Sequence, residues 1–143
     1  MGFLASDITP ISSLGPTPLI PTAKDIQTKV FQIARTESTS TLKMMLPADA
    51  SVVEVSKYGS TNSDAGTSST LNVVIANNTG TISSGTADMK TTGTTTSHVQ
   101  MSNLPNIQPL PLAGDLKVSA YVTEVGTAST AGGPWYIKVL YVR

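Results

Sequence analysis

Residues 134–142 read Pro-Trp-Tyr-Ile-Lys-Val-Leu-Tyr-Val, and this stretch decides the fold class. Successive side chains of a β-strand point to opposite faces of the sheet. One face would carry Trp135, Ile137, Val139 and Tyr141, and the other Tyr136, Lys138, Leu140 and Val142. Because both faces are largely apolar, we expect this strand to be central in a sheet or covered by another subunit.

The segment before it has the same period of two. Residues 115–125 place four apolar side chains on one face, namely Leu116, Val118, Ala120 and Val122. Residues 126–133 between the two segments contain three glycines, and they indicate a flexible hairpin loop.

Four earlier segments also alternate. Residues 26–35 predict a strand with Phe31 and Ile33 on one face and Val30 on the other. In residues 42–46 we expect Leu42, Met44 and Leu46 to point inward. After the turn at Pro47-Ala48-Asp49-Ala50, residues 51–58 predict a strand around Val53 and Val55, and residues 68–76 predict one around Leu71, Val73 and Ile75.

The middle of the chain is more polar. Asn77-Asn78-Thr79-Gly80 predicts a hairpin turn, because Asn and Gly tolerate the positive φ that tight turns require. Residues 81–96 are nearly all small or hydroxylated and indicate a short edge strand with an exposed loop, whose role stays open. Residues 98–102 predict a short strand, and the proline-rich residues 104–112 an extended crossing.

These short strands, without an amphipathic helix, predict an all-β fold for residues 24–143. We expect an antiparallel β-sandwich of the jelly-roll or Greek-key type.

Residues 1–23 form a separate segment, because four prolines exclude both a helix and a central strand. A disordered tail is one interpretation. Disordered tails, however, contain few large aliphatic residues, whereas this segment contains several. We therefore favour an extended, proline-stiffened N-terminal arm that packs on a neighbouring subunit. Its candidate protein-binding residues are Phe3, Leu4, Ile8, Ile11, Leu14, Leu19 and Ile20.

Composition limits the classes of partner. Nine acidic and nine basic residues give a net charge of zero without a basic cluster, so we expect no nucleic-acid partner. No segment is apolar enough to span a membrane, and the start lacks the pattern of a signal peptide. Cysteine is absent, which excludes disulfides and thiolate zinc sites. A neutral, hydroxyl-rich surface permits dense self-assembly.

The sequence contains little that indicates catalysis. His98 is the single histidine, and on a short strand it is typical of a half-exposed surface residue. The carboxylates occur singly, without the close pair of a glycosidase or the spacing of a calcium loop. We therefore predict no enzymatic activity, no catalytic residues, no cofactor and no metal site.

Trp135 has two interpretations. It is either a core residue of the last strand or an exposed aromatic anchor for a protein or a sugar, as Tyr58 would also be.

Three stretches carry a resemblance to a known family. They are Met44-Met45-Leu46-Pro47-Ala48-Asp49-Ala50-Ser51-Val52-Val53-Glu54-Val55, Ser69-Thr70-Leu71-Asn72-Val73-Val74-Ile75 and Trp135-Tyr136-Ile137-Lys138-Val139-Leu140-Tyr141-Val142. In the pattern of these stretches, over about residues 40–143, the chain resembles the capsid decoration or cement proteins of tailed bacteriophages. These are the small auxiliary proteins of the phage head.

The resemblance implies a virion structural protein, made in the cytoplasm of the host bacterium. It implies a homotrimer or similar oligomer on the capsid surface, bound where subunits of the major capsid protein meet and stabilising the head. Two alternatives stay open. The first is a tail or neck component of the same virion, and the second is a receptor- or carbohydrate-binding module.

Overall fold

The computed structural model describes residues 25–102 and 115–143, and within these ranges the regular structure consists of strands alone. The strands are β1 (Ile26–Ile33), β2 (Thr41–Leu46), β3 (Ser51–Gly59), β4 (Ser68–Asn77), β5 (Gly80–Asp88), β6 (Ser97–His98), β7 (Gln100–Met101), β8 (Leu116–Val125) and β9 (Trp135–Val142). None of the described residues belongs to a helix long and apolar enough to cross a bilayer.

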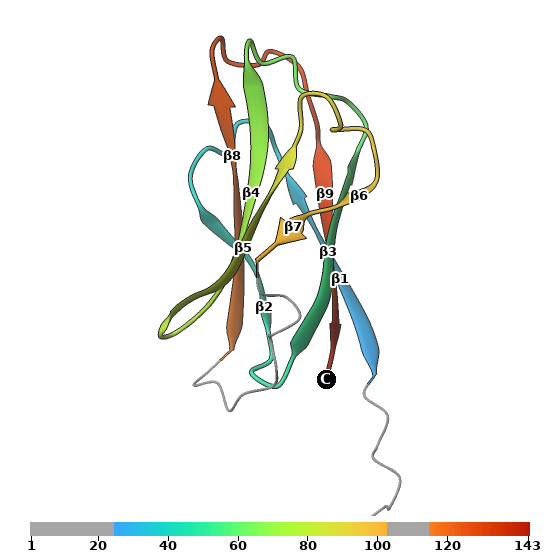
Figure 1. Cartoon of the computed structure of the whole chain (residues 1–143), viewed down its shortest axis with the longest axis vertical. Coiled ribbons are helices and arrows are strands. Elements are labelled where there is room, and N and C mark those ends of the chain that lie inside the picture. The colour runs from blue at the N-terminus through green and yellow to red at the C-terminus, as the bar shows by residue number, and fades with distance from the viewer. Residues whose placement is uncertain (1–24, 103–114) are drawn as a thin grey trace, which may run out of the picture.

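The strands form two antiparallel sheets that pack face to face (Figure 1). Sheet A has the order β1-β9-β3-β6, and sheet B has the order β2-β8-β4-β5-β7. The predicted all-β sandwich is therefore confirmed. As expected from its two apolar faces, β9 is central in its sheet, between β1 and β3.

The pairing of the strands is nested. The innermost pair is β4 with β5, and outside it β3 pairs with β6, β2 with β8, and β1 with β9. The chain therefore runs as one long hairpin of paired strands that is wrapped into two sheets, which is the arrangement of a jelly roll. Of the two sandwich types expected from the sequence, the strand order selects this one.

The core lies between the sheets and consists of the inward-facing residues of the predicted alternation. Every second residue is buried throughout β9, over residues 69–75 of β4 and over residues 116–122 of β8, as the period of two requires. Loops complete the core with Met89 and Val99, at 0% and 3% exposure. Each such side chain contributes roughly 1.5–3 kcal/mol through burial.

Two bulges change the orientation of side chains that simple alternation predicts inward. The register of β2 against β8 shifts between Leu42 and Met44, and that of β3 against β9 shifts between Val52 and Glu54. A bulge inserts one residue and moves its neighbours to the other face. Leu42 is 54% exposed, so its predicted inward position is wrong, whereas Leu46 is buried. In β3, Val53 is also 54% exposed, whereas Val55 is buried.

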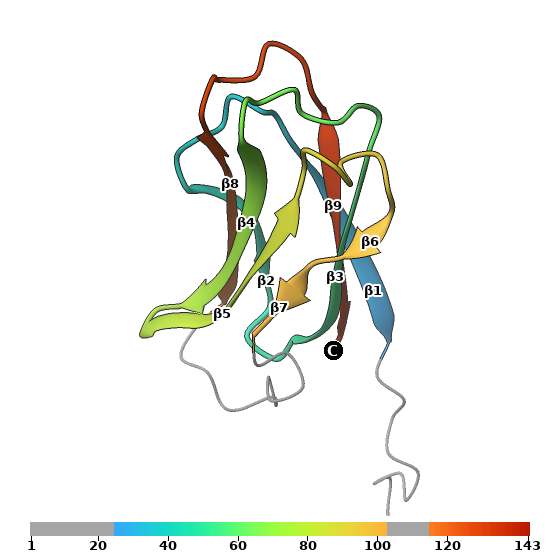
Figure 2. The ribbon, with the colours of Figure 1, turned by 45° about the horizontal axis from the view of Figure 1, so that its top comes forward.

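The connection between β8 and β9 is not the hairpin that its glycines predicted. These strands lie in different sheets, so residues 126–134 cross from sheet B to sheet A at one end of the sandwich (Figure 2). Adjacent strands of one sheet need only a short turn, whereas packed sheets are about 10 Å apart. The glycine-rich segment has the length for this crossing.

Two further predictions in the middle of the chain need correction. β5 has nine residues and lies between β4 and β7, so it is longer than the short strand expected and is not at the edge of its sheet. The single strand predicted over residues 98–102 is divided: β6 pairs with β3 in sheet A, and β7 pairs with β5 in sheet B. Residues 104–112 lie outside the described ranges.

The hairpin turn between β4 and β5 is confirmed. Asn77 pairs with Gly80, which has a φ of 146°. The Asn77 Oδ1 atom accepts hydrogen bonds from the amides of Thr79 at 2.9 Å and Gly80 at 3.1 Å. The asparagine side chain therefore holds the turn that its sequence predicted.

Candidate functional site

The predicted arm, with its candidate residues Phe3, Leu4, Ile8, Ile11, Leu14, Leu19 and Ile20, lies outside the described residues. Its point of attachment is defined, however. The Asp25 amide donates to the Arg143 carbonyl oxygen at 3.2 Å, and the Arg143 amide donates to that of Asp25 at 3.3 Å. The described part of the chain therefore begins beside the end of β9, at an edge of sheet A.

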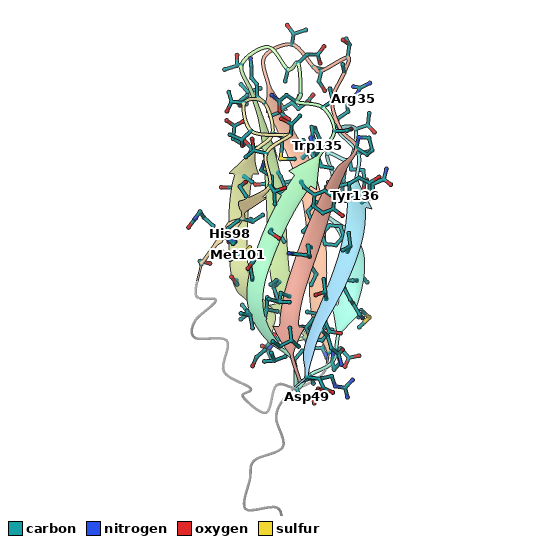
Figure 3. All side chains as sticks on the ribbon, turned by 90° about the vertical axis from the view of Figure 1, so that its right-hand side faces the viewer. Arg35, Asp49, His98, Met101, Trp135 and Tyr136 are labelled. Atoms are coloured by element: carbon teal, nitrogen blue, oxygen red, sulfur yellow. The ribbon has the colours of Figure 1, made fainter. Side chains whose placement is uncertain are left out.

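Trp135 is a core residue. Its side chain is 0% exposed, and its indole Nε1 donates a hydrogen bond to the Thr61 carbonyl oxygen at 3.0 Å. Figure 3 shows it near the end of the sandwich where the long loops gather. A side chain that is buried and has its one polar atom satisfied cannot act as an exposed anchor, so the core interpretation holds.

The outer face of sheet A, which faces the viewer in Figure 3, carries seven apolar or aromatic side chains interspersed with polar ones such as Thr28, Glu54 and Lys138. Its central strand contributes the half-buried Tyr136, Leu140 and Val142, all on the side of β9 away from the core. β1 and β3 add residues with large exposed fractions: Ile26 at 72%, Val30 at 49%, Val53 at 54% and Tyr58 at 38%. We call these seven residues the sheet A patch.

The register places the members of this patch in adjacent rows. Ile26 lies opposite Val142, and Thr28 opposite Leu140, while Val30 lies opposite Lys138. At the far end Tyr136 lies opposite Tyr58, and their rings stack with centroids 5.2 Å apart and planes at 17°. The patch therefore extends along the whole length of β9, with Lys138 as the positive charge of that strand.

His98 lies at the β6 edge of the same face. Its side chain is 69% exposed, and its Nδ1 lies 3.3 Å from the Glu54 Oε1 on β3. In the described part of the chain, no three His, Cys, Asp or Glu side chains gather closely enough to hold a metal ion. The pair is thus a surface contact between a histidine and a carboxylate, which is worth little in free energy when exposed.

The outer face of sheet B differs in chemistry from that of sheet A. Its outward-facing residues include many hydroxyls and amides, such as Thr70, Asn72, Ser84, Thr86, Ser119 and Thr123. It also carries three exposed apolar side chains, Leu42 and Met45 on the edge strand β2 and Val125 at the end of β8. Exposed apolar area is unfavourable in water, and on sheet A it follows the whole length of a central strand, so we take the face of sheet A as the candidate docking surface.

A network of hydrogen bonds fixes the loops at the Trp135 end. Glu124 accepts hydrogen bonds from the Ser129 amide at 2.9 Å and from the hydroxyls of Ser63 at 3.1 Å and Ser129. Burial raises the pKa of the Glu124 carboxyl, but these bonds together outweigh it, so the pKa lies below its ordinary value. Asp64 similarly accepts hydrogen bonds from the amides of Thr130 and Ala131, both at 2.8 Å.

The threonine-rich loop after β5 is held from inside by a lysine. Lys57 is 0% exposed, and its ammonium donates hydrogen bonds to the carbonyl oxygens of Thr92 and, at 3.1 Å, Thr95. Desolvation lowers the pKa of Lys57, against the opposing effect of the Asp88 charge. A buried ammonium requires such partners, so the loop has a structural role in satisfying this charge.

The chain matches no known protein-family model, and neither a curated protein nor a solved structure matches it significantly. The functional inference therefore depends on the geometry of its own residues.

Sequence reasoning missed the sheet A patch as a surface, although part of its signal was visible. Because the second face of residues 134–142 is also apolar, the sequence indicated a strand that is central or covered. β9 is central, but its outer face is not covered by any described residues. The exposure of Val53 depends on a bulge, and the stacking of Tyr58 on Tyr136 depends on the register of distant strands. Neither feature has a signal in local sequence.

Proposed function

We propose that the protein is a structural component of a phage virion: a decoration protein that binds the outside of the major capsid protein lattice and stabilises the head. The observation that carries this proposal is the sheet A patch, seven apolar or aromatic side chains on the outer face of one sheet of a domain without net charge. The resemblance in sequence style supports the choice of partner. The jelly-roll fold agrees with it but does not select it, because the same fold occurs in viral capsid and lectin domains.

The size of the patch indicates that a second contact is needed. Eight residues of β9 at about 3.3 Å each and three strands about 4.8 Å apart give about 26 Å by 14 Å, or about 400 Å². A stable interface buries about 800 Å² on each partner. The arm, residues 1–23, would supply the remainder, since an extended chain of that length reaches about 75 Å.

Several weak contacts become strong when they are linked. In an oligomer, each copy would contribute one patch and one arm, and linking sites raises the overall affinity by roughly 10² to 10⁴ without new contacts. A near-zero net charge allows copies to lie close together on the lattice. We therefore expect the binding form to be an oligomer, with a trimer as the expected state.

The test measures oligomeric mass and head binding of the full chain. Light scattering gives the mass of the free protein, which is then mixed with heads assembled from the major capsid protein alone and sedimented. An oligomer that sediments with the heads in a fixed ratio supports the proposal. A monomer that stays in the supernatant, or antibody labelling of intact virions at the tail or neck, would overturn it.

A matched pair of substitutions identifies the binding surface. Val30→Lys places a charge in the sheet A patch, and Thr81→Lys places the same charge at an exposed position of β5 in sheet B. Both positions are exposed, so both variants should fold. Val30→Lys should weaken sedimentation with heads at least tenfold and Thr81→Lys should not; equal binding by the two variants would exclude the patch.

A further inference from the structure

A row of four side chains crosses the outer face of sheet B. Tyr121 on β8 lies opposite Asn72 on β4, Asn72 opposite Thr86 on β5, and Thr86 opposite Gln100 on β7. Paired residues of neighbouring antiparallel strands project from the same face. Four strands therefore contribute one aromatic ring, two amides and one hydroxyl to a line about 14 Å long, at about 4.8 Å per strand.

This row lines a depression of about 290 Å³, which Val74 and Ser84 of the neighbouring row also border. The volume is close to the lower limit of small-ligand sites, about 300 Å³. Thr86 and Gln100 are exposed, and Tyr121 and Asn72 are half-buried, so the side chains are accessible from solvent.

Asn72 is held in place by its neighbours. Its Nδ2 donates hydrogen bonds to the Thr123 hydroxyl at 3.0 Å and to the Thr70 carbonyl oxygen at 3.2 Å. These two bonds use the donors of the amide and leave its Oδ1 as an acceptor for a ligand. A polar group fixed in this way loses little conformational entropy when it binds.

The chemistry of the lining restricts the class of ligand. No lining residue is charged, and Asp88, in the adjacent row, already accepts hydrogen bonds from Thr91 and the Lys90 amide. A phosphate or a nucleic-acid backbone would find no cation here. An apolar peptide would meet mainly hydroxyls and amides, which it would leave without hydrogen bonds. A neutral, polyhydroxylated ligand satisfies both the ring and the polar groups.

We propose that Tyr121, Asn72, Thr86 and Gln100 form a binding site for a neutral saccharide. The Tyr121 ring packs against the C–H groups of a pyranose, which its negative face attracts. Asn72, Thr86 and Gln100 bind hydroxyls of this or the next sugar unit along the row. The site lies on the opposite sheet from the sheet A patch and does not depend on capsid binding, so the chain can hold both partners at once.

The test is nuclear magnetic resonance of the isotope-labelled full chain with four neutral disaccharides: maltose, cellobiose, lactose and N,N′-diacetylchitobiose. At least one of them should shift the amide signals of Asn72, Thr86, Gln100 and Tyr121 in a saturable manner. Sialyllactose serves as the charged comparison and should bind no more tightly than lactose. If none of the disaccharides shifts these signals, or if the shifts map to another surface, the proposal is wrong.

Substitutions test whether the saccharide binds at this row, and a tyrosine from the outer face of each sheet is compared. Thr86→Val removes one hydroxyl without changing the shape of the side chain, and Gln100→Ala removes an exposed amide; each should weaken binding about tenfold. Tyr121→Ser should abolish it. Tyr58→Ser is the matched control, because Tyr58 is an exposed tyrosine on the outer face of sheet A. Loss of binding in Tyr58→Ser with retention in Tyr121→Ser and Thr86→Val would overturn the assignment.

Discussion

The indole of Trp135 packs directly against the backbone of Gly59, in the position that a side chain at residue 59 would occupy. A methyl group on Gly59 would collide with the ring and would also lie 2.8 Å from the Gly93 carbonyl oxygen. Gly59→Ala should therefore reduce the free energy of unfolding by about 1–3 kcal/mol through overpacking. Chemical denaturation measures this, with Thr96→Ala, an exposed substitution in the loop that contains Gly93, as the control expected within about 0.5 kcal/mol of the parent.

The buried indole also predicts a spectroscopic result. Trp135 is the single tryptophan of the chain, so intrinsic tryptophan fluorescence reports on this site alone. Emission of the folded protein should be blue-shifted and poorly quenched by iodide, and both properties should be lost on unfolding. Efficient quenching in the folded state would contradict the burial of Trp135 and restore it as a surface anchor.

Two leucines test the bulge in β2. Leu71 is 0% exposed in β4, whereas Leu42 is 54% exposed beside the bulge. Leu71→Ala should cost about 2–5 kcal/mol of stability, because it leaves a cavity. Leu42→Ala should cost less than about 0.5 kcal/mol. A similar loss for both variants in urea denaturation would show that Leu42 points into the core after all.

Acid should weaken the loop network around Glu124. The folded-state pKa of Glu124 is lowered from its ordinary 4.5, so the stabilisation is present above that value and is lost as the pH falls through the folded-state pKa. At neutral pH, Glu124→Gln should be less stable than the parent by about 1.5–3 kcal/mol, since bonds to a charged acceptor are lost. The difference should shrink as the pH falls below 4.5 and through the folded-state pKa, and a difference that stays constant in thermal melts down to the lowest pH at which the parent folds would refute the linkage.

Deletion of residues 2–21 separates the arm from the domain. The described strands begin at Ile26, so the truncated chain should keep the circular dichroism of a β-sandwich and unfold cooperatively. Light scattering should show fewer copies in each oligomer than for the full chain, or the truncated chain should bind heads more weakly. An unfolded truncated chain would show instead that the arm belongs to the domain's own core.

The sequence predicts the fold well where alternation is uninterrupted. In β4 and β8 the buried apolar positions could be named, because a strand with one buried face must place its apolar residues at every second position. In β9 the two faces could be separated, but both are largely apolar, so the sequence did not show which one points inward. Prediction failed at Leu42, where a bulge adds one residue and reverses the faces. The hairpin predicted for the glycine-rich residues 126–133 was wrong for another reason. A flexible segment does not specify which sheet the next strand joins.

The candidate sites are harder to predict than the fold, because they are made by pairing between distant residues. Tyr58 and Tyr136 meet through the register of β3 with β9, and Tyr121 meets Asn72 through that of β8 with β4. Local sequence identifies each residue as outward-facing and polar or aromatic. It does not show which outward-facing residues share a row, since that depends on the whole topology.

The central place of β9 in sheet A sets a condition on the order of folding. A ribosome makes residues 135–142 after all the other described strands, yet β1 pairs with β9 alone, and β3 has otherwise only the two-residue β6 as a partner. The strands of sheet B, in contrast, are complete once β8 has been made. A nascent chain that stops at residue 134 would thus contain every strand of one layer and lack the middle of the other. The sheet A patch cannot form until synthesis has passed Val142, so no partner can bind through it before the domain is able to fold.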